Sequence, residues 1–275
     1  MIHIICALKC EAKSLIAHYR LKVCAEPAAF PLYMSQDKQT SLTICGIGKI
    51  NAAAATAFTH AFLQTGKQDI WLNIGIAGHK NLDIGKIIIA HKIVEQSTQQ
   101  SWYPQILCSP LCRSMEVLSC DHPATDYTDT VFSDSIFEME AAGFYATACR
   151  FATSELIHVV KIISDNQQHP ADKISASFVA GLLKDKLEII EQLITSLRQL
   201  AKDLDSPNET PDYYGQIIEK WRFTHTQRNK LKSCLNRWHV LCPDENPLKV
   251  LDGSLHGRDV INQITNKLDM FPICF

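Results

Sequence analysis

The chain has 275 residues, of which 46% are apolar and 20% are charged, and its formal net charge at pH 7 is -2. This length and composition predict one large folded domain, or one domain with an appendage. The near-neutral charge gives no reason to expect a nucleic-acid, membrane or acidic partner for the chain as a whole, so such a partner must be recognised by a local feature.

The first residues differ from a targeting segment. Charged side chains occur at Lys9, Glu11 and Lys13, too early for a signal peptide, and no apolar run approaches the ~18 residues of a membrane span. The cysteines are scattered singly without a CxxC pair, which is typical of reduced thiols. We therefore expect a cytoplasmic protein with no membrane partner, no metal and no cofactor.

Apolar, β-branched runs predict buried strands, and several of them are followed by helical patterns. The runs lie at residues 2–6, 42–45, 70–74, 87–94 and 157–163. Strands that alternate with helices favour an α/β sheet with helices on its faces.

The spacing of apolar residues predicts helices, the first of which contains Ala12, Leu15 and Ile16 and follows the first strand. After the second strand, one helical face is shared by Ile50, Ala54, Ala57, Phe58, Ala61 and Phe62. Residues 177–204 carry an apolar stripe with the period of one long helix, which we expect to close the main domain.

The segment DSPNETPD, residues 205–212, contains two prolines and several turn-forming residues. Such a segment interrupts a helix and marks a boundary. We expect a main domain at residues 1–204 and a mainly helical C-terminal extension of unknown role at residues 205–275.

The extension contains a basic stretch. Between residues 220 and 243 six lysines and arginines occur without an acidic residue, with Trp221, Phe223, His225 and Trp238 among them. The favoured interpretation is a helix whose apolar side, with Leu231, Leu235 and Trp238, packs on the main domain while its charges meet water. Binding of nucleic acid through residues 220–240, with aromatic side chains stacking on bases, is the second interpretation.

The sequence GIGK, residues 46–49, stands between a predicted strand and a predicted helix. A triphosphate-binding loop requires serine or threonine after the lysine, and Ile50 stands there instead. This excludes a triphosphate loop. A glycine turn at a helix N-terminus still suits an anion, a sugar oxygen or a closely packed ligand.

Three further stretches contain polar residues near the ends of predicted strands. They are NIGIAG at residues 73–78, EMEA at 138–141 and ISD at 163–165. Open α/β sheets bind ligands at the carboxyl ends of their strands. Taken singly, each stretch also fits a structural role as turn glycines, a helix start or a helix cap.

Taken together and in this order, these stretches, GIGK and the ALKCEA that begins at Ala7 resemble the methylthioadenosine/S-adenosylhomocysteine nucleosidases of the nucleoside phosphorylase superfamily. The similarity covers roughly residues 1–204. It implies a three-layer α/β/α sandwich with a mixed central sheet, assembled as a homodimer. It also implies that the chain hydrolyses the N-glycosidic bond of a purine nucleoside, related to methylthioadenosine or adenosylhomocysteine, and releases the free base.

The resemblance assigns roles to three carboxyl groups. Glu11 matches the general base that activates water, Asp165 the acid that protonates the purine, and Glu140 the group that holds the ribose hydroxyls. Cleavage of this bond requires one group to donate a proton while another accepts one. The other residues implied to bind the substrate are Ile47, Gly75, Ile76, Ala77, Gly78, Met139 and Ser164.

The sequence also departs from the relatives. Asn73 and Ile74 stand where phosphorylases have a phosphate-binding arginine, which favours water as the nucleophile. His122 and Pro123 stand near the expected position of the aromatic residue that stacks on the purine. Two alternatives stay open: a purine nucleoside phosphorylase that binds phosphate through Lys49, Lys161 or a histidine, and a non-catalytic protein that binds nucleosides or associates with nucleic acid.

Overall fold

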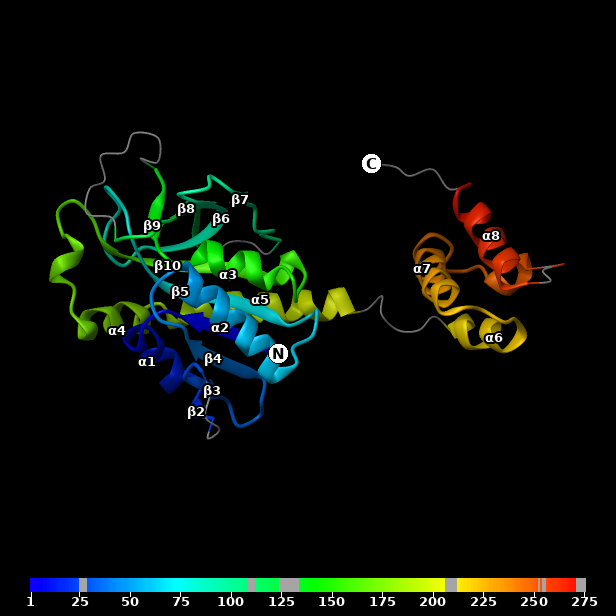
Figure 1. The fold of residues 1–275 in the computed structure, drawn as a ribbon, viewed down its shortest axis with the longest axis horizontal. Helices are drawn as coiled ribbons and strands as arrows, with labels where there is room; N and C mark the ends of the chain where they lie inside the picture. Colours follow the sequence, from blue (N-terminus) through cyan, green and yellow to red (C-terminus); the bar gives the residue numbers. More distant parts are fainter. Residues whose placement is uncertain are drawn as a thin grey trace. The chain divides into compact units, whose positions relative to one another are not determined.

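The computed structural model describes residues 1–24, 29–107, 112–123, 134–205, 212–251, 253 and 256–270. The chain forms two compact units, Met1–Asp203 and Leu204–Phe275 (Figure 1). Each unit is described by itself below.

A mixed β-sheet occupies the middle of the first unit. Its strands in the described residues are β1 (Ile2–Cys6), β2 (Lys22–Val23), β3 (Leu32–Met34), β4 (Thr40–Ile44), β5 (Ile70–Gly78), β6 (Ile87–Glu95), β7 (Ser101–Trp102), β8 (Arg113–Ser119), β9 (Ile136–Glu138) and β10 (Ile157–Asp165). Every residue of β1 and of β10 is buried. Strands covered on both faces need apolar residues at successive positions, which is why they are visible in the sequence as continuous runs.

The sheet is partly closed on itself. Strand β5 pairs in parallel with β1 on one side and with β10 on the other. From β1 the sheet continues through β4 and β3 to β2, whereas from β10 it continues through β6 and β8 to β9. Strand β9 then pairs with β5 at Phe137 and Gly78, which closes a ring of five strands. The closure brings the carboxyl ends of β5 and β10 beside β9.

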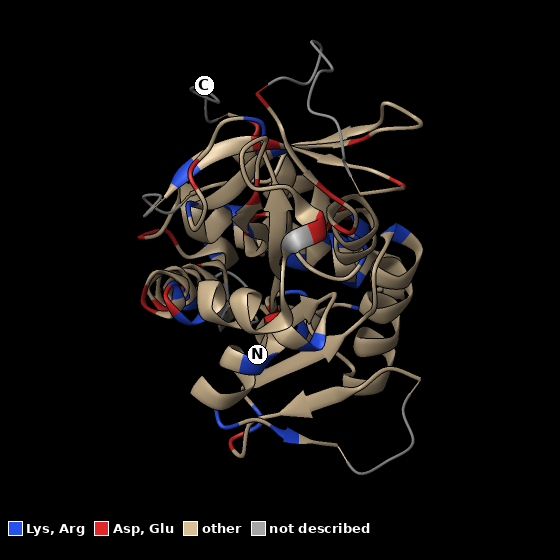
Figure 2. Ribbon diagram, turned by 90° about the vertical axis from the view of Figure 1, so that its left-hand side faces the viewer, with Lys and Arg blue, Asp and Glu red and all other residues tan. Residues whose placement is uncertain are grey.

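Helices cover both faces of the sheet. They are α1 (Lys9–His18), α2 (Lys49–Leu63), α3 (Ala141–Ala148), α4 (Ala176–Lys184) and α5 (Leu187–Asp205). Helix α1 packs on α4, and α2 packs on α3. Charged residues lie mainly on the helices and loops, and the strands between them are largely uncharged (Figure 2). This arrangement confirms the predicted α/β/α fold with a mixed central sheet.

The expected single helix over residues 177–204 is wrong. Helix α4 ends at Lys184, and α5 begins at Leu187. The apolar stripe continues across the interruption, because Leu183 before it and Ile190 after it are both buried. Since the turn keeps the apolar positions of both helices facing inward, the periodicity of the sequence does not reveal the break.

Helix α2 forms where the spacing predicts it, but the face that carries its larger apolar residues points outward. Its buried residues are Ala52, Ala55, Thr56 and Thr59, whereas Ile50 is 85% exposed and Phe62 is 38% exposed. The cause is close packing on α3, where a Cβ atom at Gly143 would lie 2.0 Å from the carbonyl oxygen of Lys49. Helices this close can place only small side chains between them, so the large apolar residues of α2 point outward.

The second unit consists of α6 (Asp212–Lys220), α7 (His225–Leu241), the short 3₁₀ helix η4 (Pro247–Val250) and α8 (Gly257–Leu268). It has its own apolar core, to which α7 contributes Leu231, Leu235 and Trp238. The expectation that this side of α7 packs on the main domain is therefore wrong, because it packs on residues of its own unit. No helix in the described parts of either unit combines the length and apolarity needed to cross a bilayer.

Candidate active site

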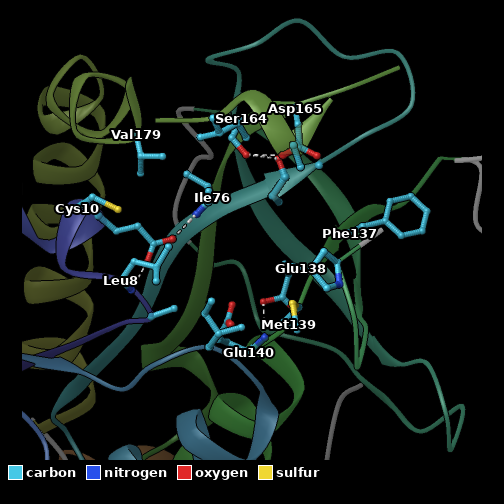
Figure 3. Close-up of a pocket in the computed structure, with 18 of the residues that line it drawn as sticks. Leu8, Cys10, Ile76, Phe137, Glu138, Met139, Glu140, Ser164, Asp165 and Val179 are labelled. Carbon is cyan, nitrogen blue, oxygen red and sulfur yellow. Dashed lines mark hydrogen bonds between the residues drawn. The ribbon is translucent and has the colours of Figure 1, made fainter. Parts of the chain in front are cut away.

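A cavity of about 430 Å³ lies at the carboxyl ends of β5 and β10, and Figure 3 shows its lining. This volume is within the range of small-molecule sites. The predicted site residues that line it are Glu11, Ile47, Ile76, Ala77, Gly78, Met139, Glu140, Ser164 and Asp165. Residues from motifs far apart in the sequence thus surround one space.

Gly75 is the predicted site residue that is not part of this lining. It lies behind Glu11, where a Cβ atom would be only 2.7 Å from Glu11 Oε1. Glycine is needed at this position because the carboxyl group occupies the space that a side chain would take. Gly75 thus contacts a lining carboxyl group from outside the cavity.

Glu11 is buried in the first turn of α1. The backbone N–H groups of Leu8 and Ile76 donate to its two carboxyl oxygens, at 2.8 and 2.9 Å. Burial raises the pKa of Glu11 to about 6, although the charge of Lys161 and the two N–H donors oppose this. A carboxyl group with such a pKa is able to accept a proton near neutral pH.

The GIGK turn positions a second carboxyl group. Gly46 and Gly48 have φ angles of +84° and +106°, which side chains with a Cβ atom rarely adopt. In this conformation the N–H of Gly48 donates to Glu140 Oε1 at 2.9 Å. Burial raises the pKa of Glu140 against the opposing charge of Lys161. The anion that this turn binds is therefore a carboxylate of the chain itself.

Lys161 lies between two glutamates and is only 1% exposed. Its Nζ is 2.8 Å from Glu138 Oε2 and 3.5 Å from Glu140 Oε2. Although burial opposes it, the two carboxylates raise the pKa of Lys161. Glu138 also accepts the N–H groups of Glu140 and Ala141 at the start of α3, so the carboxylate of Glu138 is held in place on several sides.

Asp165 ends β10 after an irregularity in the pairing with β5 between Ile163 and Asp165. Ser164 Oγ donates to Asp165 Oδ1 at 2.6 Å, and the carbonyl oxygen of Asp165 accepts the N–H of His79. In the view of Figure 3, Asp165 and Glu140 lie on opposite sides of the cavity. A ligand in this cavity would therefore have a carboxyl group at each side.

Much of the remaining lining was not predicted. One wall comes from the segment that leads into α4, with Ala171, Ile174, Ser175, Ala176 and Val179. Other parts of the lining are formed by Leu8, Cys10, Phe137 and Glu138. The lining also includes His122 and Pro123, which the sequence places near the expected contact with the purine. The apolar members carry no chemical signal in the sequence, so only the folded chain assigns them to the site.

Lys49, a candidate phosphate ligand, has carboxylate partners. Its Nζ is 2.7 Å from Asp121 Oδ1 and also contacts Glu95. With Lys161 held by Glu138 and Glu140, both candidate lysines are paired with acidic side chains of the chain.

No protein-family model and no curated protein sequence matches the chain. Solved structures do match it. A methylthioadenosine/S-adenosylhomocysteine nucleosidase from Helicobacter pylori has a TM-score of 0.58 at 14% identity, with 71% of this chain and 97% of that chain covered. A futalosine hydrolase mutant from Helicobacter pylori has a TM-score of 0.56 at 15% identity, with 71% and 98% covered.

The corresponding nucleosidase from S. pneumoniae has a TM-score of 0.55 at 18% identity, with 69% of this chain and 96% of that chain covered. Nearly the whole of each solved chain is thus matched by about seven tenths of this one. Over that part, the chain has the fold of the nucleosidases and futalosine hydrolases of the nucleoside phosphorylase superfamily.

Proposed function

We propose that the chain hydrolyses the N-glycosidic bond of a purine nucleoside and releases the free base. The observation that carries this proposal is the cavity, in which the buried Glu11, with a pKa of about 6, and Asp165, held by Ser164, line the same space. The shared fold supports it, since the matched structures are a futalosine hydrolase and nucleosidases for methylthioadenosine and adenosylhomocysteine. We propose a nucleoside of this kind, or a related one, as substrate.

Two proton transfers are needed. As the bond from C1′ of the ribose to the purine breaks, the electron pair leaves with the base, and Asp165 donates a proton to the purine at N7. Water forms the new bond to C1′, and Glu11 accepts its proton. While the bond breaks, the sugar resembles an oxocarbenium ion. The proton donor Asp165 must therefore act on the leaving purine, and the proton acceptor Glu11 must act on the attacking water.

Glu140 holds the ribose in this proposal. Its Oε1 is fixed by the N–H of Gly48, which orients the carboxylate toward the sugar hydroxyls. Met139 lies against the sugar, and Ile47 lines the cavity beside it. A carboxylate fixed in advance loses little freedom when the substrate binds, which favours a precise position of C1′.

Water fits this site better than phosphate. The carboxyl groups of Glu11, Glu138 and Glu140 all interact with the single ammonium group of Lys161. An excess of carboxyl groups gives a negative potential, which repels a phosphate dianion and stabilises a cationic sugar. The pairing of Lys49 with Glu95 and Asp121 removes a second cation from that role.

The experiment follows free base released from methylthioadenosine, adenosylhomocysteine, 5′-deoxyadenosine, inosine, adenosine and futalosine, with and without phosphate. We expect release from at least one nucleoside without phosphate, and a loss of about 100-fold or more in Asp165→Asn and in Glu11→Gln. Asp185→Asn and Glu188→Gln are matched controls, because both residues are exposed and outside the cavity. No release by the unmodified chain would refute the proposal, and release only with phosphate would establish a phosphorylase.

We also propose that the chain forms a homodimer through the outward face of α2. Ile50 is 85% exposed there, and Phe58 and Phe62 stack with ring centroids 5.6 Å apart. Phe58 is partly exposed and Phe62 is 38% exposed, so apolar side chains extend along this face of the helix, as they do at many protein interfaces. We expect a dimer by size-exclusion chromatography with light scattering, and monomer for Ile50→Glu. A monomeric unmodified chain would contradict this.

A further inference from the structure

Helices α6 and α7 of the second unit form a helix–turn–helix. Helix α6 ends at Lys220, and α7 begins at His225, so four residues join them. Trp221 of this turn is buried in the core of the unit, and Thr224 caps α7 by accepting the N–H of Gln227. Figure 1 shows that α7 runs away from α6 rather than back alongside it. In proteins that bind DNA, such a motif presents its second helix to the major groove.

The outward face of α7 is polar and uncharged along its middle. The core-facing residues are Leu231, Cys234, Leu235 and Trp238. On the opposite side, Thr226, Asn229 and Ser233 are exposed, and Asn236 is partly exposed. These four residues follow one another at steps of three and four, so they form one row along the helix. Side chains of these types form hydrogen bonds with base edges.

Basic residues stand on both sides of this row. Arg228 and Lys232 lie on one flank of α7, and Lys230 and Arg237 lie on the other. All four are exposed, and no acidic residue occurs from 220 to 243. The charges of α7 are therefore directed outward in two lines.

Two of these residues have contacts within the unit, and both contacts are weak. Lys232 Nζ lies 5.1 Å from the ring centroid of Tyr214, and Arg237 is 3.8 Å from Asp269 Oδ1. Both partners of the second pair are about half exposed, and surface pairs of this kind contribute about 0–1 kcal/mol. Neither contact prevents the side chain from meeting a phosphate.

We infer that α7 binds duplex DNA, with its two basic flanks on the phosphates and its polar row toward the major groove. A single strand would need several exposed aromatic rings for stacking, and Trp221 and Trp238 are only 8% and 2% exposed. Phe223 packs against the core of the unit, which leaves His225 as the exposed ring among the four aromatic residues of this stretch. The deep, narrow major groove of duplex RNA does not admit a helix, whereas that of B-form DNA does. Charge on both flanks of one helix matches the two phosphate backbones that border that groove.

The test measures fluorescence anisotropy of a labelled 25-base-pair DNA duplex with the full chain. If four phosphates are contacted, the affinity falls about 100-fold between 50 and 200 mM salt. We expect Arg228→Gln/Lys230→Gln/Lys232→Gln/Arg237→Gln to lose most of the affinity and of its salt dependence. Two double variants, Arg228→Gln/Lys232→Gln and Lys230→Gln/Arg237→Gln, each remove one flank. In each of them the slope of log affinity against log salt concentration should fall by about half. These double variants keep the test valid if the fourfold variant does not fold.

The matched control removes four exposed lysines from the first unit: Lys22, Lys67, Lys184 and Lys202, each changed to Gln. It should bind DNA as the unmodified chain does, and all variants should retain the same nucleosidase activity. Absence of duplex binding at 50 mM salt, or equal losses in control and α7 variants, would overturn the inference. Preferential binding of duplex RNA, of a single strand or of vesicles containing anionic lipid would overturn it as well.

Discussion

The pKa of Glu11 sets the pH range in which the proposed base can work. Burial raises that pKa to about 6, and only the ionised carboxylate accepts a proton from water. We therefore expect kcat/KM to fall about tenfold for each pH unit below about 6. The measurement is the initial rate of base release from pH 4.5 to 8.5, with folding followed by circular dichroism at each pH.

A pH profile that stays flat to pH 5 in the folded chain would contradict this role of Glu11. The variant Glu188→Gln serves as control, because its carboxyl group is exposed on α5 and its loss should leave the profile unchanged. The residual activity of Glu11→Gln should lack this acidic limb.

Lys161 is expected to stabilise the folded chain through its buried ion pairs. Removing its charge in Lys161→Met leaves Glu138 and Glu140 buried without their cation, and breaking a buried ion pair in this way costs about 3–5 kcal/mol of unfolding free energy. Urea unfolding measures the loss. Lys161→Arg keeps the charge and should lose much less, although its planar head fits the site differently.

A double variant separates charge from packing. Glu138→Gln combined with Lys161→Met removes one charge of each sign, so it should be more stable than Lys161→Met alone. If Lys161→Met alone is as stable as the unmodified chain, the ion pairs do not contribute as we expect.

At the level of helices, Gly143 determines how closely α2 approaches α3. A Cβ atom there would lie 2.0 Å from the backbone oxygen of Lys49, which cannot move without shifting the turn that holds Glu140. We expect Gly143→Ala to destabilise the fold by about 1–3 kcal/mol and to lower kcat. Urea unfolding and base release measure the two effects.

Gly181→Ala is the matched control, because Gly181 lies inside α4 and a Cβ atom there meets nothing within 4 Å. Such a change should be neutral or stabilise the chain by up to about 1 kcal/mol. Equal effects of the two alanines would show that close packing at Gly143 is not important.

The strands buried on both faces were predictable, whereas the buried side of α2 was not. Residues of β1 and β10 are buried on both sides, so their sequence is apolar throughout. The inner face of α2 consists of alanine and threonine, which carry little hydrophobic signal, whereas its exposed face has the larger apolar residues. Periodicity therefore indicated the position of this helix but not which of its sides is buried.

In the candidate site, too, some features could be predicted from the sequence and others could not. Glu11, Glu140 and Asp165 occur in short motifs next to predicted strands, and the folded chain brings them to one cavity. The partnership of Lys161 with Glu138 could not be predicted, because it joins β10 to β9 across the closed part of the sheet. Pairing between strands distant in the sequence leaves no local pattern.

At the level of the whole molecule, catalysis and DNA binding are proposed for different units. Among the residues that the structure describes, those that line the cavity lie between Ala7 and Val179, and the buried apolar core of the second unit is formed from residue 214 onward. We therefore expect a chain truncated after Asp205 to fold and to retain base release within about twofold. The same truncation should abolish binding of duplex DNA, and both properties are measured on one preparation.

Thermal unfolding gives an independent check on this separation. Two units with separate cores should unfold in two transitions in the full chain, because in the described part of the chain each core is built from residues of its own unit. The smaller unit should account for the transition with the smaller enthalpy, since unfolding enthalpy scales with the number of residues. Truncation should remove that transition and leave the other in place. A single transition in the full chain, together with loss of base release on truncation, would show instead that the C-terminal unit is needed for the nucleosidase fold.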